Sequence, residues 1–319
     1  MQVTLGFDTS CYTTSAAAVN GQGEVVAASR MLLPVAKGQR GLRQSEAVFA
    51  HVRQMPLVMA ELQKQLSPME AQVVAVCASS KPRDGADSYM PVFTVGLGHA
   101  SVLSSALNVP LYETSHQRGH IAAGLVGNEE PAGRFVALHL SGGTTELLEC
   151  CEEGLKPLGG CADLHAGQLV DRVGVALNLP FPAGPALERL AAEWESPTEG
   201  IFPVSIDKDG LTCHFSGIET RAQQLIQSGE YPAERIAAEV YDVLARTVAR
   251  LLDAAGRRCG AGQALVVGGV ASSLRLRRLL DERLAKLRSP VRAMFGQPCY
   301  SGDNAAGVAW IGMKNYRNR

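Results

Sequence analysis

The sequence predicts an α/β protein built from two related lobes, and three observations lead to this prediction. A hairpin with two apolar, β-prone arms around a polar turn occurs twice, at residues 5–19 and 135–148. Elsewhere, apolar strand-like runs alternate with longer stretches of helical spacing, which indicates an α/β class with mostly parallel strands. The chain has 319 residues, of which 46% are apolar, enough for two domains or one large one.

The two hairpins align without a gap, which indicates an internal duplication. Their hydroxyl residues coincide: Ser10 falls on Ser141, Thr13 on Thr144 and Thr14 on Thr145. Gly142 and Gly143 let the backbone approach a ligand closely, and the hydroxyls add hydrogen-bond donors, so this turn suits a phosphate. Either turn alone is also compatible with an ordinary surface hairpin. The repetition favours a nucleotide site between two lobes.

The first half continues with alternating strands and helices. We expect them at these positions: a strand at 25–33, a helix at 45–65 capped by Ser45, a strand at 73–78, a helix at 95–107 and a short strand at 109–112. A polar loop follows the strand at 73–78, and loops after parallel strands are where sites are built.

Two histidines in the next segment can form part of a metal site. His116 and His120 are four residues apart, so on a helix they share a face and can chelate one divalent ion. The alternative is a pair of polar residues at a helix start. A third, oxygen ligand has to come from elsewhere. Asp303 is the candidate, although it is also well placed to cap the last helix.

The second half opens after a polar, proline-containing boundary at 128–133. A helix at 161–179 is expected to carry Asp163, His165 and Asp171. In a nucleotide site Asp171 can accept hydrogen bonds from ribose hydroxyls, and Gly184 can allow close approach of a sugar. Taken singly, Asp171 is better explained as an exposed helix charge paired with Arg172 or a neighbour.

A third nucleotide-like element lies near the C-terminal end. We expect a strand and turn at 212–217 and an amphipathic helix at 233–257. An apolar strand at 264–270 follows, ends in the Gly268 and Gly269 loop, and leads into a helix at Ser272. The start of that helix attracts anions or the sugar edge of a ligand.

Composition and charge restrict the compartment and the partners. The formal net charge is −1, so the protein has no overall positive charge that would indicate nucleic-acid binding. Basic residues cluster at 275–292 and 314–319. The simpler interpretation of these clusters is a solvated helix face, although they also permit contact with RNA. The eight cysteines include no C-x-x-C pair, which indicates buried thiols in a reducing compartment. With no leader-like start and no membrane-spanning run, we expect a cytoplasmic protein.

Seven motifs, in their order along the chain, resemble the TsaD-like tRNA threonylcarbamoyladenosine transferases, a glycoprotease-like family of the actin-like ATPase superfamily. They are SCYTT, HQRGH, SGGTTEL, AGQLVDRVG with PAGP, HFSG, VVGGV and SGDNAAGVA. The resemblance implies two actin-like, ribonuclease H-like lobes with the duplicated phosphate hairpin around a central nucleotide and metal cleft. We expect an N-terminal lobe at 1–130 with the H-x-x-x-H motif, and a C-terminal lobe at 131–319 whose last helix returns to the first lobe.

The resemblance also implies the site residues. One divalent ion, iron or zinc, would be held by His116, His120 and Asp303. Nucleotide contacts would come from the glycine turns and the ribose-facing positions: Leu140, Ser141, Gly142, Gly143, Thr144, Asp171, Gly184, Gly268, Gly269 and Ser273. The implied reaction transfers a threonylcarbamoyl group from threonylcarbamoyl-adenylate to adenosine in tRNA, with no catalytic side-chain nucleophile assigned. A protease is set aside, because the chain has no H-E-x-x-H motif.

The chain departs from the family pattern at substrate-facing positions, which favours a divergent paralogue. Tyr12, Thr13, Thr144 and Ser273 replace the usual residues, and the loop at 81–89 is rebuilt. Three hypotheses follow: a tRNA threonylcarbamoyl transferase, a carbamoyl-type transferase with a different acceptor, and a nucleotide-binding regulatory partner subunit. The expected partners are an adenine nucleotide, tRNA, and TsaB-like or TsaE-like proteins or a second copy, with no membrane.

Overall fold

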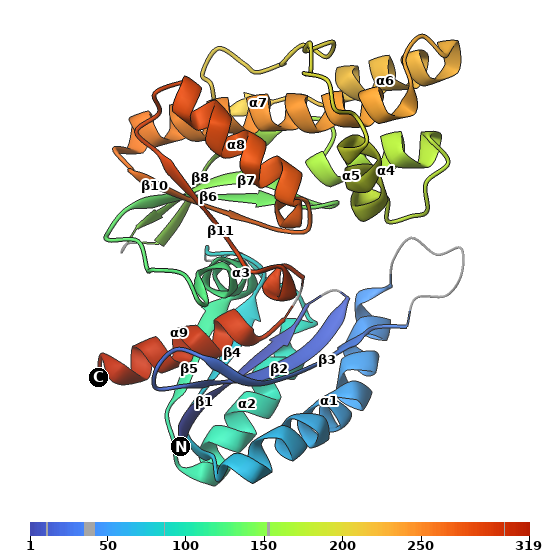
Figure 1. Ribbon diagram of the computed structural model, residues 1–319. Helices are drawn as coiled ribbons and strands as arrows, with labels where there is room; N and C mark the ends of the chain where they lie inside the picture. Colours follow the sequence, from blue (N-terminus) through green and yellow to red (C-terminus); the bar gives the residue numbers. More distant parts are fainter. Residues whose placement is uncertain (11, 35–41, 86, 152–153, 303) are drawn as a thin grey trace. The chain divides into compact units, whose positions relative to one another are not determined.

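The computed structural model describes residues 1–10, 12–34, 42–85, 87–151, 154–302 and 304–319 (Figure 1). Contacts between residues divide the chain into two compact units. The first contains Met1–Glu129 and Cys299–Arg319, and the second contains Glu130–Pro298. The C-terminal helix therefore belongs to the first unit.

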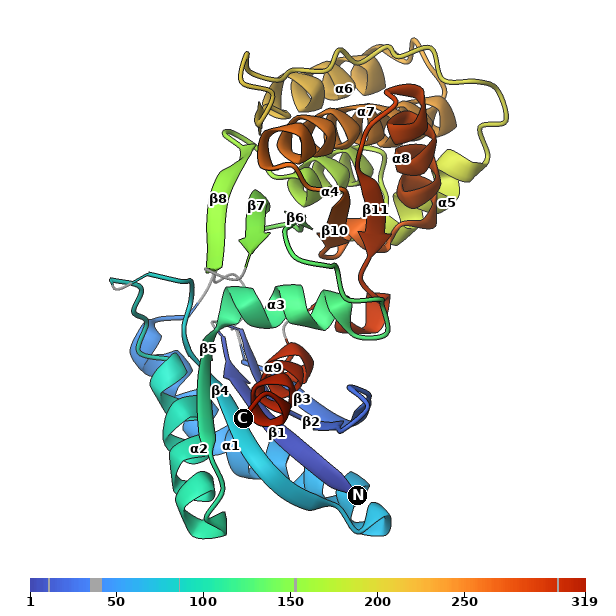
Figure 2. The ribbon, with the colours of Figure 1, turned by 90° about the vertical axis from the view of Figure 1, so that its left-hand side faces the viewer.

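The first unit is a sheet with helices on both faces. Its elements are β1 (Gln2–Thr9), β2 (Thr13–Asn20), β3 (Val25–Leu32), α1 (Gln44–Leu66), β4 (Gln72–Lys81), α2 (Phe93–Leu107), β5 (Leu111–Ser115), α3 (His116–Leu125) and α9 (Ala306–Arg317). The strand order is β3-β2-β1-β4-β5. Helices α1 and α2 cover one face of the sheet, and α9 covers the other with α3 beside it (Figures 1 and 2).

Alternation along β1 decides which side chains meet which helices, because successive strand residues point to opposite faces. Val3, Leu5 and Phe7 join the apolar cluster under α1 and α2. Gly6 lies on the other face, where a Cβ would overlap the backbone of Ala309 in α9. Asp8, two residues further on, is therefore on the face that carries α3 and α9.

The second unit is built around its own sheet. Its elements are β6 (Phe135–Leu140), β7 (Thr145–Cys151), β8 (Gly154–Cys161), α4 (Ala166–Ala176), α5 (Gly184–Ala192), β9 (Thr212–Cys213), α6 (Ser216–Ser228), α7 (Ala233–Cys259), β10 (Gln263–Val267), α8 (Leu274–Lys286) and β11 (Arg292–Phe295). The long helix α7 packs against β6, β7 and β10, and α4, α5, α6 and α8 pack against α7 (Figure 1). A single apolar cluster joins these elements.

The duplication inferred from the two hairpins is present in the topology. The second sheet has the order β11-β10-β6-β7-β8-β9, so β6, β7, β8, β10 and β11 occupy the positions of β1, β2, β3, β4 and β5. In each sheet the hairpin and the strand that follows it pair antiparallel, while the remaining matched strands pair parallel. β8 and β9 also pair parallel, so five of the nine strand pairs described are parallel and both sheets are mixed.

Two local predictions need correction. Ser45 does not cap α1, because the helix begins one residue earlier with Arg43 as its N-cap, and the Glu46 carboxylate accepts the Arg43 main-chain N–H at 3.1 Å. The predicted helix at 161–179 begins only at Ala166. The residues before it belong to β8 and to a turn, since Cys161 pairs with Cys213 in the sheet.

Among the described helices, none combines the length and the hydropathy needed to span a membrane. Cys77, Cys150 and Cys213 are buried, whereas Cys299 is exposed. Cys11 lies outside the described residues.

Candidate functional site

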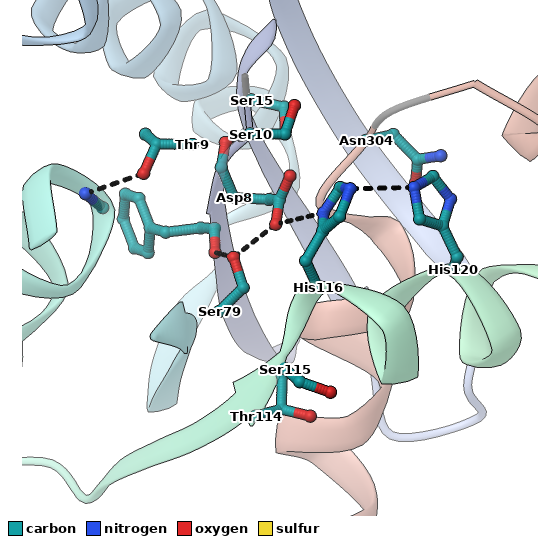
Figure 3. A network of polar contacts seen from close by, with 12 residues as sticks. Asp8, Thr9, Ser10, Ser15, Ser79, Thr114, Ser115, His116, His120 and Asn304 are labelled. Atoms are coloured by element: carbon teal, nitrogen blue, oxygen red, sulfur yellow. Dashed lines mark hydrogen bonds and ion pairs between the residues drawn. The ribbon is translucent and has the colours of Figure 1, made fainter. Parts of the chain in front are cut away.

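The predicted histidine pair lies on one face of α3, as the spacing indicated. His116 is the first residue of this helix and His120 follows one turn later. Their Nε2 atoms are 3.0 Å apart, and the rings meet edge to face with centroids 4.4 Å apart (Figure 3). Two imidazole nitrogens at about 2.0–2.1 Å from one ion lie about 3 Å apart at a right angle and about 3.3 Å apart at the tetrahedral angle usual for zinc. The separation suits a shared divalent ion.

A third residue, which the sequence did not single out, contacts this pair. The Asp8 side chain in β1 is fully buried, and its Oδ1 accepts a hydrogen bond from Nδ1 of His116 at 2.9 Å (Figure 3). The Ser79 hydroxyl donates to the same oxygen. The other oxygen, Oδ2, is buried and has no hydrogen-bond partner in the described part of the chain.

These residues fit a cation. A buried carboxylate oxygen without a donor is costly unless a positive charge compensates it, and a carboxylate that accepts from a metal-binding histidine is the usual outer support of such sites. Asp303, the predicted third ligand, lies outside the described residues. Within the described ranges, His, Cys, Asp and Glu side chains form no cluster of three that could hold a metal ion.

Helix α3 is fixed at its start by a network from the loop after β4. Ser115 caps the helix by accepting the Arg118 N–H at 3.2 Å, and its hydroxyl donates to Asp84 at 2.8 Å. The second carboxylate oxygen of Asp84 pairs with the Arg118 guanidinium at 2.6 Å. Asp84, in the loop after β4, therefore holds the start of the helix that carries the histidines.

The same helix lies against α9 at very short range. Gly307 in α9 faces Gly119 and Ala123 of α3, and a Cβ on Gly307 would overlap the Gly119 carbonyl oxygen. Only glycine allows this approach, because any other residue carries a Cβ there. The small-residue sequence of the last helix thus sets the distance between α9 and the histidine helix.

The first hairpin turn is supported by a buried histidine. Nε2 of His51 lies 2.8 Å from the Ser10 carbonyl, and Nδ1 lies 2.7 Å from the Thr14 hydroxyl. Burial lowers the pKa of His51, which favours a neutral ring that donates to Ser10. This contact fixes the turn between β1 and β2.

The second hairpin turn has its own internal support. The Ser141 N–H donates to the Thr144 carbonyl at 2.8 Å, and the Gly143 N–H to the Ser141 hydroxyl at 3.3 Å. Gly142 and Gly143 are exposed. Gly167 of α4 packs on the turn so closely that a Cβ there would overlap the Gly142 N–H. The turn therefore lies directly at the start of α4.

A cavity of about 450 Å³ in the second unit begins at this turn, within the usual size range of small-molecule sites. It contacts five of the predicted nucleotide residues: Gly142, Asp171, Gly184, Gly269 and Ser273. The other five, Leu140, Ser141, Gly143, Thr144 and Gly268, do not line it, and the Leu140 side chain is part of the core. Glu188 and Tyr241, which the sequence did not single out, also line the cavity.

Asp171 and Gly184 come together through short contacts. Asp171 is half-buried, and its Oδ1 accepts the Ala183 N–H at 2.8 Å, which holds the segment just before α5. The Tyr241 hydroxyl donates to the Gly184 carbonyl at 3.1 Å. Burial raises the pKa of Tyr241, so the phenol stays protonated and keeps this bond. Asp171 is thus part of the cavity wall and is not a free surface charge.

Ser273 acts mainly as a helix cap. Its hydroxyl accepts the Leu276 N–H at 3.1 Å at the start of α8, one turn after the Gly268 and Gly269 loop. Gly268 has φ +100°, and a Cβ there would overlap the Leu140 carbonyl oxygen. The glycine lets β10 end against the second hairpin.

Asp163 and His165 lie before α4 and have other partners. Asp163 accepts the main-chain N–H groups of Phe215 at 2.9 Å and Ser216 at 3.2 Å, so it caps the start of α6. His165 is the N-cap of α4. Neither residue lines the cavity.

The sequence resembles one family over most of its length. The sequence model of the TsaD family, described as tRNA N6-adenosine threonylcarbamoyltransferase, matches residues 34–310. A protein of that name from Syntrophobacter fumaroxidans is 31% identical over 333 residues, covering 99% of this chain and 94% of that protein. Another from Thermus thermophilus is 32% identical over 321 residues, covering 98% and 93%.

The fold also has solved counterparts. Component A of the Acidaminococcus fermentans (R)-2-hydroxyglutaryl-CoA dehydratase superposes with a TM-score of 0.56 at 14% identity, covering 99% of this chain and 100% of that one. At this identity the likeness concerns the fold alone. It is the actin-like ATPase fold, which confirms the predicted fold class.

Proposed function

The chain belongs to the TsaD family of tRNA N6-adenosine threonylcarbamoyltransferases, and on this premise we propose that it transfers a threonylcarbamoyl group from threonylcarbamoyl-adenylate to the exocyclic amine of an adenosine in tRNA. In the transfer, the amine nitrogen bonds to the carbamoyl carbon, the bond from that carbon to the phosphate oxygen breaks, AMP leaves, and the amine loses one proton. The family match spans both the histidine pair and the glycine turns, and this observation carries the proposal.

The cavity of the second unit is the proposed nucleotide site. Its glycine turn has two exposed residues without side chains, Gly142 and Gly143, which would let a phosphate approach the main chain closely. Asp171 would accept the ribose hydroxyls, and Gly184 would let the sugar lie against the start of α5. Gly269 and Ser273 would line the site, and Leu140, Ser141, Thr144 and Gly268, which do not line the cavity, would act by shaping the turn.

The histidine pair is the proposed metal site, completed by Asp303. An iron or zinc ion held there would polarise the carbamoyl oxygen of the mixed anhydride. The protein's own part is to orient the two rings: α3 fixes their spacing, and Asp8 holds His116. No side-chain nucleophile is needed, because the amine of the acceptor attacks directly.

The experiment is AMP release from threonylcarbamoyl-adenylate by the purified, metal-loaded protein, with and without bulk tRNA. We expect release that depends on tRNA, together with threonylcarbamoyl-adenosine in the tRNA after nuclease digestion. His116→Ala with His120→Ala, and separately Asp303→Asn, serve as site variants and should release little AMP. Metal-dependent release without any need for tRNA would contradict the proposed acceptor. Absence of release from a protein that binds ATP tightly would contradict the transferase itself.

A further inference from the structure

We infer that Asp8 is the positioning residue of the histidine pair: its buried carboxylate selects the tautomer of His116 that carries hydrogen on Nδ1, so that the Nε2 lone pair is presented to a metal ion. This inference rests on the proposed metal site at His116 and His120. It concerns a residue 108 positions before His116 in the chain.

The contact is built by the sheet and the helix together. Asp8 is on the face of β1 that carries α3 and α9, and its side chain is fully buried, while the His116 side chain is 20% exposed. Oδ1 accepts from His116 and from the hydroxyl of Ser79 in β4, so the carboxylate is held from two sides (Figure 3). A carboxylate fixed in this way leaves little freedom to the ring that donates to it.

Hydrogen bonding decides the tautomer of the neutral rings. An ionised carboxylate has no hydrogen to donate, so the contact at 2.9 Å requires hydrogen on His116 Nδ1. A neutral imidazole carries one such hydrogen, and Nε2 of His116 is then an acceptor. Nε2 of His120 lies 3.0 Å from this acceptor nitrogen.

The neighbouring groups also oppose rotation of the His116 ring. The Phe93 ring lies on one side of His116 with centroids 5.6 Å apart, and the His120 ring lies 4.4 Å away. Turning the imidazole over would exchange Nδ1 with a carbon atom and leave the buried Asp8 without its nitrogen donor. Losing the partner of a buried charged group is costly, so Asp8 fixes the ring orientation as well as the tautomer.

The negative charge has a further effect on the site. A carboxylate that accepts from the far nitrogen of an imidazole makes the ring a better metal ligand. The second oxygen of Asp8 has no hydrogen-bond partner in the described residues, so its charge is not neutralised by a donor there. Asp8 thus combines orientation with local negative charge beside the histidine pair.

Two measurements on the full chain test this role, and one needs no metal. In metal-free protein with 15N-labelled histidine, NMR should show His116 protonated on Nδ1, and Asp8→Ala should give a mixture of the two tautomers. In titrations with Zn²⁺ or Co²⁺ alone, Asp8→Ala should bind the ion roughly 10- to 100-fold more weakly. The visible spectrum of the Co²⁺ form should change with it.

Two further variants separate positioning from folding. Asp8→Asn keeps the size of the side chain and an oxygen that accepts from His116, so it should fold and regain part of the affinity lost in Asp8→Ala. Ser15→Ala is the matched control, because the Ser15 hydroxyl donates at 3.1 Å to the Asp8 main-chain carbonyl and leaves the carboxylate untouched. Its metal affinity and tautomer should equal those of the wild type.

The outcomes distinguish this inference from the proposed metal site. A wild-type protein that binds Zn²⁺ at His116 and His120, with unchanged affinity in folded Asp8→Ala, would overturn the role of Asp8 and leave the metal site standing. Hydrogen on Nε2 of His116 in the wild type would do the same. A wild-type protein that binds neither ion at the two histidines would overturn the metal site and the inference with it.

Discussion

Replacing Asp171 with alanine should weaken nucleotide binding by about one to two orders of magnitude. Asp171 lines the cavity of the second unit, and one of its carboxylate oxygens is engaged by the Ala183 N–H. In the proposed site the ribose hydroxyls donate to this carboxylate. Hydrogen bonds to charged groups contribute about 1.5–3 kcal/mol, which corresponds to roughly a 10- to 140-fold change in the dissociation constant.

The same substitution also affects folding, and this has to be measured separately. Ala183 is fully buried, so its N–H loses its acceptor when Asp171 is shortened. An unsatisfied buried donor costs about 1–3 kcal/mol of unfolding free energy. Asp171→Asn provides the comparison, because its amide oxygen still accepts from Ala183 while the charge is removed. It should retain most of the stability and lose less affinity than Asp171→Ala.

Calorimetric titration with ATP and with 2′,3′-dideoxy-ATP separates the ribose contact from other effects. If Asp171 binds the hydroxyls, Asp171→Ala should weaken ATP binding strongly and dideoxy-ATP binding little, so the two changes are not additive. The reasoning is refuted if both ligands lose affinity by the same factor, or if folded Asp171→Ala binds ATP as tightly as the wild type.

Two other predictions concern the packing of α9 and the reactivity of Cys161. Gly307→Ala should destabilise the first unit by about 1–3 kcal/mol, because the new methyl group overlaps the Gly119 carbonyl oxygen. Denaturant unfolding measures this loss of stability. The control Gly217→Ala, which has open space around the new methyl group, should show no loss of stability. Cys161 should be alkylated by iodoacetamide with a rate that rises through about pH 7, because a hydrogen bond from the Cys213 thiol lowers the pKa of Cys161 to about 7 and the thiolate is the reactive form. In Cys213→Ala the rise should move to higher pH; an unchanged profile would contradict the contact between the two thiols.

Short sequence patterns were sufficient to predict much of the fold. The repeated hairpin at 5–19 and 135–148 indicated two related lobes, and the structure has two sheets of matching strand order. The four-residue spacing placed His116 and His120 on one face of a helix, and the helix exists. Strand alternation, helical spacing and glycine turns act within a few residues, so a linear sequence is sufficient to recognise them.

Errors and omissions arose where a residue's role depends on distant partners. Asp163 and His165 were assigned to a helix, but β8 continues to Cys161 because Cys213 pairs with it across the sheet. Glu188 and Tyr241 were not expected in the cavity, since nothing in their neighbouring sequence marks them.

The sequence by itself determined the family, the α/β class, the duplication and the helix face that carries the two histidines. Only the tertiary structure decided that Asp8 accepts a hydrogen bond from His116, and that the last helix lies against α3. The physical reason is that these contacts depend on strand order and on the close approach of Gly307 to Gly119. Such distances are set by packing across the whole unit, which no local pattern records.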